Sequence, residues 1–263
     1  MNSVSSDFLR LRQVCLAAPR LAPAEAALRE ILGIEVVHRS DLADAFGLQN
    51  AVFALNGSFI EIVAPLREDA AAARFLQRNG GRGGYIAILD CGDLERRRAA
   101  AERLGIRIAH AAQRAGAQYI QLHPRDIGAV MLEIDHHVGG ADRFGHYEWG
   151  GAHWREAVRT DVAVDLLGIE LCSEEHETLA KRWADVLERP SQRRDGALTC
   201  VELDFGELRF ASTSATDEEM LSSICLSVRD EAGVAATAAR LGYHTTVDTF
   251  QFCGVTWRLS RAG

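Results

Sequence analysis

Residues 123–133 read His-Pro-Arg-Asp-Ile-Gly-Ala-Val-Met-Leu-Glu, a turn that leads into an apolar strand with an acidic residue inside it. A similar strand comes earlier, because residues 59–65 read Phe-Ile-Glu-Ile-Val-Ala-Pro. The acidic residues of the two strands, Glu61 and Glu133, are 72 residues apart (133 − 61). Such a repeat indicates a duplicated structural unit.

Working outward from these two strands, the chain divides into four units with the same order of elements. Each unit predicts a strand, a helix and then three more strands, with Gly33 and Gly105 ending the first two helices and Asp93 capping the second. Because one unit cannot bury both its helix and its sheet face, the units are expected to pair. The expected units cover residues 8–65, 82–135, 161–212 and 221–260, with helices at 23–32, 93–104, 174–187 and 231–241.

The predicted fold class is therefore α+β, with two tandem domains that each contain a pair of β-α-β-β-β units. The N-terminal domain is expected over 8–135 and the C-terminal domain over 161–261. Residues 136–160 are rich in Gly, His and aromatic residues and have no clean period, so they are interpreted as a linker.

The bulk composition limits the possible partners. The hydrophobic fraction is 48%, the charged fraction is 25% and the formal net charge is −8, so nucleic acid is not an expected partner. No C-x-x-C pair is present, and the six cysteines are expected to be buried reduced thiols. Without a signal-like N-terminus or a long apolar run, we expect a cytoplasmic protein without membrane contact, as a monomer or homodimer.

Paired β-α-β-β-β units resemble the vicinal oxygen chelate superfamily, which includes glyoxalases, bleomycin-resistance proteins and extradiol dioxygenases. Residues 123–133 are most similar to the last hairpin of methylmalonyl-CoA epimerases, and residues 59–65 to the matching strand one unit earlier. Residues 11–14 and 84–87 resemble the two opening strands. The resemblance implies that each pair of units forms a curved, cup-shaped sheet. It also implies a divalent metal held by one residue from each opening and closing strand.

In this sequence those four places correspond to Gln13, Glu61, Tyr85 and Glu133. Gln13 and Tyr85 are also 72 residues apart (85 − 13), so a pseudo-twofold axis is expected to bring the four side chains together. The superfamily usually has His where this chain has Gln13 and Tyr85. Metal ligation by Gln13, Glu61 and Glu133 would supply only oxygen atoms, which favours Mg²⁺ or Mn²⁺ over Zn²⁺ or Fe²⁺. The alternative is a metal-free polar pocket.

The resemblance implies a lyase or isomerase that removes a proton next to the carbonyl of a small carbonyl compound or acyl thioester. Glu61 and Glu133 would hold the metal, or one would act as the base. Tyr85 would donate a hydrogen bond to the developing oxyanion, while Gln13 and His123 are candidates for substrate binding. A second base for an epimerase is not evident.

Two alternatives stay open at this point. One is a non-catalytic protein that sequesters a small ligand, and the other is an extradiol-type dioxygenase. A nucleotide cofactor is not expected, because the glycines at residues 80–84 lead into a strand and not into a helix. The C-terminal domain is interpreted as structural or as an anion site. The four matching places there hold Leu166, Arg209, Ser223 and Arg258.

Each of these residues also has a structural interpretation. Glu61 and Glu133 could form salt bridges at the sheet ends, Tyr85 could be a core aromatic and His123 could belong to a turn. Four histidines in the linker match no standard metal-ligand spacing, and a packed linker is the preferred interpretation. They are His136, His137, His146 and His153.

Overall fold

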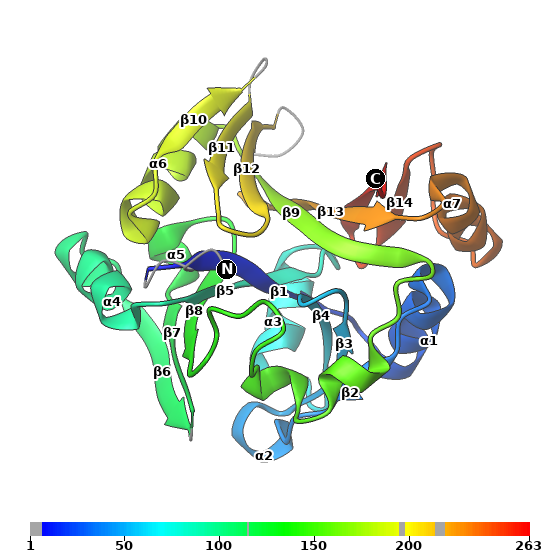
Figure 1. The fold of residues 1–263 in the computed structure, drawn as a ribbon, viewed down its shortest axis with the longest axis horizontal. Coiled ribbons are helices and arrows are strands. Elements are labelled where there is room, and N and C mark those ends of the chain that lie inside the picture. The colour runs from blue at the N-terminus through cyan, green and yellow to red at the C-terminus, as the bar shows by residue number, and fades with distance from the viewer. Residues whose placement is uncertain (1–6, 115, 195–197, 214–218) are drawn as a thin grey trace. The chain divides into compact units, whose positions relative to one another are not determined.

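The computed structural model of the protein describes residues 7–114, 116–194, 198–213 and 219–263. It contains two curved mixed sheets, one of eight strands and one of seven (Figure 1). The strand orders are β2-β3-β4-β1-β5-β8-β7-β6 and β10-β11-β12-β9-β13-β15-β14. The predicted α+β class with two tandem domains is therefore confirmed. The boundaries expected for the domains and the linker stay a prediction.

The first module follows the predicted order and adds a short helix. Its strands and helices are β1 (Leu9–Ala17), α1 (Leu21–Leu32), β2 (Val36–His38), α2 (Ala43–Phe46), β3 (Leu48–Ala54) and β4 (Phe59–Pro65). As predicted, Gly33 ends α1. It adopts a left-handed conformation with φ of 65°, and its N–H donates to the carbonyl of Arg29. Strand β1 runs parallel to β4, and β3 runs antiparallel to β4.

The second module is preceded by α3 (Ala71–Arg78), a helix that the strand pattern does not predict. Asp93 caps the helix α4, as predicted, by accepting a hydrogen bond from the N–H of Arg96 at 3.0 Å. The module contains β5 (Gly84–Cys91), α4 (Leu94–Arg103), β6 (Ile108–Arg114), β7 (Ala117–Leu122), α5 (Pro124–Ile127) and β8 (Met131–His137).

Two short 3-10 helices, Glu148–Gly150 and Trp154–Ala157, precede the third module. Tyr147 and Trp154 are fully buried, in agreement with a packed segment here. The third module contains β9 (Ala163–Ser173), α6 (His176–Leu187), β10 (Ser191–Arg194), β11 (Leu198–Glu202) and β12 (Glu207–Ser212).

The fourth module departs from the expected order, because only two strands follow its helix. It contains β13 (Met220–Val228), α7 (Glu231–Arg240), β14 (Thr249–Phe252) and β15 (Val255–Arg261). The missing strand is reduced to one isolated bridge between Thr245 and Phe250. Thr246 explains the difference, because its hydroxyl bonds to Asp248 and Thr249 and closes a local turn.

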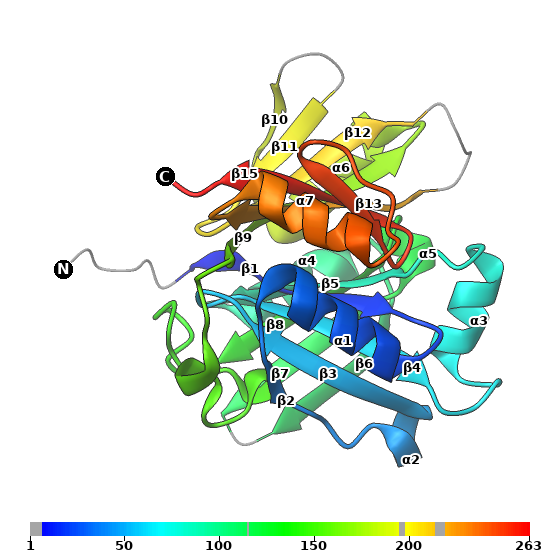
Figure 2. The ribbon, with the colours of Figure 1, turned by 90° about the vertical axis from the view of Figure 1, so that its right-hand side faces the viewer.

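The chain forms two compact units, and each contains most of two modules, because the opening strands β1, β5, β9 and β13 are divided between the units. The first unit covers Met1–Arg12, Ile86–Glu148 and Gly168–Ser222, and the second covers Gln13–Tyr85, Trp149–Leu167 and Ser223–Gly263. In the first unit α4 packs against α6. In the second unit α1 packs against α7, as Figure 2 shows. Each compact unit therefore combines most of one module that ends before residue 138 with most of one that begins after residue 162.

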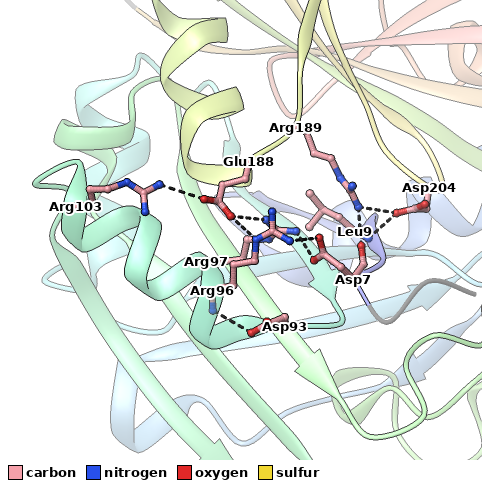
Figure 3. Close-up of polar contacts among 9 residues, drawn as sticks. All are labelled: Asp7, Leu9, Asp93, Arg96, Arg97, Arg103, Glu188, Arg189 and Asp204. Carbon is pink, nitrogen blue, oxygen red and sulfur yellow. Dashed lines mark hydrogen bonds and ion pairs between the residues drawn. The ribbon is translucent and has the colours of Figure 1, made fainter.

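An ion-pair network ties α4 to the end of α6 inside the first unit (Figure 3). The fully buried Arg97 binds Asp7 at 2.6 Å and Glu188 at 3.5 Å, and Arg103 binds Glu188 at 3.1 Å. Glu188 is the residue that ends α6, with a left-handed φ of 46°. The position at which α6 stops therefore places a carboxylate against the arginines of α4.

All six cysteines are free, and all except Cys253 are buried, as the sequence predicts. No helix among the described residues is both long enough and apolar enough to span a membrane.

Candidate functional site

Glu61 is the centre of a polar cluster in the second compact unit. It lies in β4 opposite Cys15 of β1, and its side chain is directed to the same face of the sheet as Gln13. The Gln13 amide nitrogen donates to one carboxylate oxygen at 2.9 Å, and the Asn50 amide nitrogen donates to the other at 2.6 Å. Only 8% of Glu61 is exposed. The sequence thus correctly predicts that Gln13 and Glu61 meet.

Burial is the main influence on the acidity of Glu61. Desolvation raises its pKa, and hydrogen bonds from Asn50, Cys15 and Gln13 offset part of the increase. A carboxylate whose pKa is raised is a stronger base once it is ionised. The two amides also fix the orientation of the carboxylate, so the arrangement suits proton transfer to or from a bound molecule.

Tyr85 lies at the start of β5 and belongs to the same compact unit as Glu61. Burial raises the pKa of Tyr85 to about 12, with the charges of Cys15 and Glu61 acting in the same direction. The positive charges of Arg74 and Arg78 on α3 oppose this increase. Tyr85 therefore stays protonated at neutral pH and can donate a hydrogen bond.

The register of the strands corrects the equivalence between Gln13 and Tyr85. Gln13 pairs with Phe59, two residues before Glu61. In the second module it is Ile86 that pairs with Met131, two residues before Glu133. Ile86 is thus the residue equivalent to Gln13, and Tyr85 lies one residue earlier. A one-residue shift changes the face to which a strand residue points, so the two opening strands are not matched in the expected way.

Glu133 lies in the first compact unit and has its own amide partner. The Gln121 side chain, directly opposite on β7, donates to the Glu133 carboxylate at 2.6 Å. Tyr119 lies two residues before Gln121 on β7, and its hydroxyl is 3.0 Å from His110 Nδ1. Burial, followed by the charge of Glu133, raises the pKa of Tyr119 to about 12. Because Glu61 and Glu133 belong to different compact units, their meeting in one site stays a prediction.

Four residues beside the glutamates are not predicted from the sequence: Asn50, Gln121, Tyr119 and His110. Their positions beside the glutamates depend on which strands pair and in which register. The available signal was the pair Gln118 and Gln121, which interrupt an apolar run along residues 117–122 and, being three residues apart, point to opposite faces of the strand. That signal marks a half-exposed strand and does not identify a partner.

His123 forms the N-cap of the short helix α5, since its ring nitrogen accepts the N–H of Arg125 at 3.2 Å. The structural interpretation of His123 as a turn residue is therefore confirmed. A contact between His123 and a substrate stays a prediction.

A buried charged network also lies in the first compact unit. Arg10 binds Asp90 at 2.8 Å, and His137 Nδ1 lies 3.3 Å from the other oxygen of Asp90. Burial would raise the pKa of Asp90, but the hydrogen bond and charge of His137 and the charge of Arg10 lower it overall. Since each charge is paired, this network is interpreted as structural.

The available side chains do not fit the metal site that the resemblance implies. The place equivalent to Gln13 holds Ile86, which has no donor atom. Gln13 directs its amide nitrogen, and not its oxygen, at Glu61. Among the described residues, no group of three or more His, Cys, Asp or Glu side chains is placed to hold a metal ion. We therefore derive no catalytic step through a metal.

The C-terminal places contain no set of acidic or imidazole ligands either. The Arg209 side chain binds Glu207, and Arg258 Nε donates to the hydroxyl of Ser223 at 3.2 Å. Strand register also changes one of these places. Glu170 is opposite Arg209, so the residue equivalent to Gln13 is Gly168 and not Leu166. Arg209 is therefore neutralised by its own strand, which weakens the interpretation of this place as an anion site.

The comparisons with known proteins place this arrangement in a family. A family model described as a glyoxalase-like domain matches residues 14–187, and the chain belongs to this family. A solved structure of a hypothetical protein from Staphylococcus aureus matches 97% of this chain and 100% of that one. It has a TM-score of 0.66 and 8% identity, which supports the fold alone.

Relatives with named activities cover about half of the chain. The human mitochondrial methylmalonyl-CoA epimerase is 29% identical over 129 residues, which is 48% of this chain and 73% of that protein. The ethylmalonyl-CoA/methylmalonyl-CoA epimerase of Cereibacter sphaeroides is 28% identical over 130 residues, 48% of this chain and 96% of that protein. The chain is thus a distant relative of acyl-CoA epimerases.

Proposed function

We propose that the protein is an isomerase-type enzyme that removes a proton from the carbon next to the carbonyl group of an acyl thioester. The observation that carries the proposal is Glu61, a buried carboxylate with a raised pKa whose two oxygens are oriented by Gln13 and Asn50. The distant relationship to acyl-CoA epimerases supports the thioester as the substrate class.

In this reaction the Glu61 carboxylate takes the proton, and the electron pair of the C–H bond moves to form an enolate whose negative charge lies on the thioester oxygen. The protonated Tyr85 is the proposed hydrogen-bond donor to that oxygen. Arg74 and Arg78, whose charges act on the Tyr85 hydroxyl, would stabilise the same negative charge. Return of the proton from Glu61 to the same face of the enolate regenerates the substrate, whereas delivery of a proton to the opposite face inverts the carbon and completes the isomerisation. Neither outcome consumes a co-reactant.

The proposal is tested by deuterium exchange in D₂O with propionyl-CoA and methylmalonyl-CoA, followed by loss of the α-proton signal in NMR. We expect exchange with the wild-type protein and a decrease of about 100-fold or more in Glu61→Gln, since a general base contributes 10²- to 10⁴-fold. Glu68→Gln, which alters an exposed residue after β4, is the matched control. Equal exchange in wild type and Glu61→Gln would overturn the proposal.

Further variants test the roles of the other predicted residues. Tyr85→Phe is expected to slow exchange without preventing binding of the thioester, because it removes one donor to the enolate. Glu133→Gln tests whether the second predicted carboxylate takes part. A Glu133→Gln protein that exchanges at the wild-type rate would exclude Glu133 as a base for this step.

A non-catalytic binding protein is the second candidate function. Two observations favour it. The position equivalent to Gln13 holds Ile86, which cannot act as a ligand. Both carboxylate oxygens of Glu61 already accept hydrogen bonds, from Gln13 and Asn50. Saturable binding of a thioester to the wild-type protein without deuterium exchange would support this function in place of the first.

A further inference from the structure

Asn50 is a buried amide beside the proposed base. It lies on β3, where Val52 is the residue opposite Glu61 of β4, so Asn50 and Glu61 are diagonal neighbours on the same face of the sheet. The Asn50 amide nitrogen donates to a Glu61 carboxylate oxygen at 2.6 Å, and Asn50 is 2% exposed. A hydrogen bond that is short and shielded from water constrains the carboxylate strongly.

The backbone of Ser40 holds the other end of the Asn50 amide. The Ser40 N–H donates to the amide oxygen at 2.8 Å. A backbone N–H can only donate, so the atom that faces Ser40 must be the oxygen, and the amide nitrogen must therefore face Glu61. The flipped amide would set two acceptors, the amide oxygen and the carboxylate, against each other. The Ser40 N–H thus selects the orientation in which Asn50 is a donor to Glu61.

The pairing of β2 with β3 brings the Ser40 N–H to this place. His38 is the last residue of β2 and is opposite Val52. The same register, continued by two residues, sets Ser40 opposite Asn50. Arg39 donates from its guanidinium to the backbone carbonyl of Asn50 at 3.1 Å. Residues 39 and 40 therefore hold both the main chain and the side chain of Asn50.

Arg39 is itself fixed to helix α1. Its second guanidinium nitrogen pairs with Glu25 at 2.7 Å. The pair is partly exposed, so its contribution to stability is small, but it limits the positions that the Arg39 side chain adopts. A continuous set of contacts thus runs from α1 through the segment after β2 and Asn50 to the Glu61 carboxylate.

The hydrogen bond from Asn50 also acts on the protonation of Glu61. Burial raises the pKa of Glu61, and the hydrogen bond from Asn50 is the largest of the influences that oppose this increase, before those from Cys15 and Gln13. A general base must be ionised to accept a proton. Loss of the Asn50 donor would therefore leave more of Glu61 in the protonated form, in which it cannot act as a base.

From this geometry we infer that Asn50 is the positioning residue of Glu61, and that the backbone N–H of Ser40 fixes Asn50 as a donor to the base. The inference rests on the proposed function, because Glu61 needs a positioning residue only if it is the base. The contacts themselves can be tested on the Glu61 carboxyl group without any substrate. The segment after β2 thereby takes part in the reaction through Asn50.

The first test removes the backbone donor. Ser40→Pro lacks the N–H that holds Asn50, whereas Ser40→Ala retains it and is the matched control. The measurement is the NMR titration of the ¹³C-labelled Glu61 carboxyl group. We expect the midpoint in Ser40→Pro to lie about 0.5 pH unit or more above that of wild type, because the donor to the ionised carboxylate is no longer held in place. The midpoint in Ser40→Ala is expected to be unchanged.

A second pair of variants changes the amide itself. Asn50→Asp keeps the acceptor for Ser40 but replaces the donor that faces Glu61 with a carboxyl oxygen. Two carboxyl groups in contact share one proton, so the upper midpoint of the pair is expected to lie about one pH unit or more above that of wild-type Glu61. Gln49→Glu adds the same charge at the neighbouring exposed position, on the opposite face of β3. It is expected to shift the midpoint by less than about 0.3 pH unit.

Deuterium exchange with methylmalonyl-CoA, measured against pH, is the second readout. In Ser40→Pro we expect the half-maximal rate at a pH that is higher by the same amount as the NMR midpoint, with binding of the thioester within about twofold of wild type. A merely structural role of Ser40 would lower the stability without moving the pH profile.

The outcomes separate this inference from the proposed function. Equal midpoints in Ser40→Pro and Ser40→Ala, or an unshifted midpoint in Asn50→Asp, overturn the inference, and exchange by wild-type protein then leaves the function standing. Raised midpoints in Ser40→Pro and Asn50→Asp, without any exchange by wild type, support the contacts with Glu61 and overturn its function as a base. If Ser40→Pro does not fold, the comparison of Asn50→Asp with Gln49→Glu decides.

Discussion

At the scale of single residues, Glu61 has features that suit a reactive base but reduce the stability of the fold. Its carboxylate is buried, and burial raises its pKa despite the amide hydrogen bonds. An ionised group in such a place costs folding free energy. The protein retains that cost at a carboxylate that two amides orient, an arrangement in which a reactive base has a use.

This cost predicts a pH dependence of stability. Between the unfolded pKa of about 4.3 and the higher folded pKa, the folded state binds more protons than the unfolded state. The contribution of Glu61 is therefore fully present below about pH 4.3 and is lost as pH rises through the folded pKa. We expect the free energy of unfolding of wild type, relative to Glu61→Gln, to decrease between pH 4.5 and 8.

The measurement is urea denaturation of both proteins across that range. Each unit of pKa increase corresponds to about 1.4 kcal/mol of lost relative stability. Glu68→Gln, compared with wild type in the same way, provides the background. A relative stability of wild type over Glu61→Gln that increases with pH would mean that the pKa of Glu61 is lowered, contrary to the structure.

Single residues also show what could be predicted from the sequence. The caps at Gly33 and Asp93 were predicted correctly, because they depend on neighbours within a few residues. The equivalence of Tyr85 to Gln13 was wrong by one residue, because sequence spacing does not define strand register. Asn50 was missed, since its contact with Glu61 depends on the pairing of β3 with β4.

At the scale of the elements, the junction between α3 and β5 depends on one glycine. A Cβ atom at Gly83 would lie 2.1 Å from the carbonyl oxygen of Ala17 and 3.0 Å from that of Cys253. Both backbone segments are hydrogen-bonded to Gly83. The Gly83 N–H donates to the carbonyl of Cys253, and the Ala17 N–H donates to the carbonyl of Gly83. The opening of the second module thus requires a residue without a side chain.

We expect Gly83→Ala to lower the free energy of unfolding by about 3 kcal/mol or more, because backbone must move to admit the methyl group. Gly80→Ala is the matched control in the same loop, where no atom lies within 4 Å of the added Cβ. Its cost is expected to be about 1–2 kcal/mol from its left-handed φ alone. Thermal and urea denaturation measure both variants, and equal losses would contradict the steric argument.

The order of strands was predicted correctly for three modules. It was wrong for the fourth, in which two strands and not three follow the helix. A pattern of apolar residues specifies that a strand is possible, but the polar side chains of residues 246–249 form a local turn instead. Helix α3 was missed because it has only 8 residues, of which only Ala72 and Leu76 are buried. Short elements of this kind are defined by their surroundings more than by their own pattern.

At the scale of the whole molecule, modules that are distant in sequence share a compact unit. In the first unit the contact between α4 and α6 includes Glu188, which meets Arg96, Arg97 and Arg103 (Figure 3). Arg97 is fully buried, so loss of one acidic partner leaves its charge poorly compensated. Residues 96–98 are three consecutive arginines, and the middle one, Arg97, lies in the interior of the unit and not on the solvated face of the helix.

We expect Glu188→Gln to lower the free energy of unfolding by about 1–2 kcal/mol, with a smaller difference at high salt. Glu177→Gln is the control, since Glu177 lies on the same helix in an exposed ion pair with Arg193. Its effect is expected to stay within about 0.5 kcal/mol. Denaturation at two salt concentrations checks both values, and equal losses would contradict a special role for Glu188.

The duplicated architecture and the glutamates at matched strand positions were predictable, because each repeat contains the same pattern of apolar residues. The functional conclusion depends on the pairing of the strands more than on the sequence repeat. The pairing brings Gln13 and Asn50 to Glu61, and it places Ile86, which cannot be a ligand, at the position equivalent to Gln13. For this reason the donor set that the resemblance implies is not the set that these strand positions supply.

The most direct test of the central claim is the titration of the Glu61 carboxyl group itself. Protein labelled with ¹³C at the glutamate carboxyl carbon is titrated by NMR, and the signal is assigned by its loss in Glu61→Gln. We predict a midpoint clearly above the value of about 4.3 for an exposed glutamate. A midpoint at or below that value would show that Glu61 is an ordinary ionised carboxylate and would contradict its role as the base.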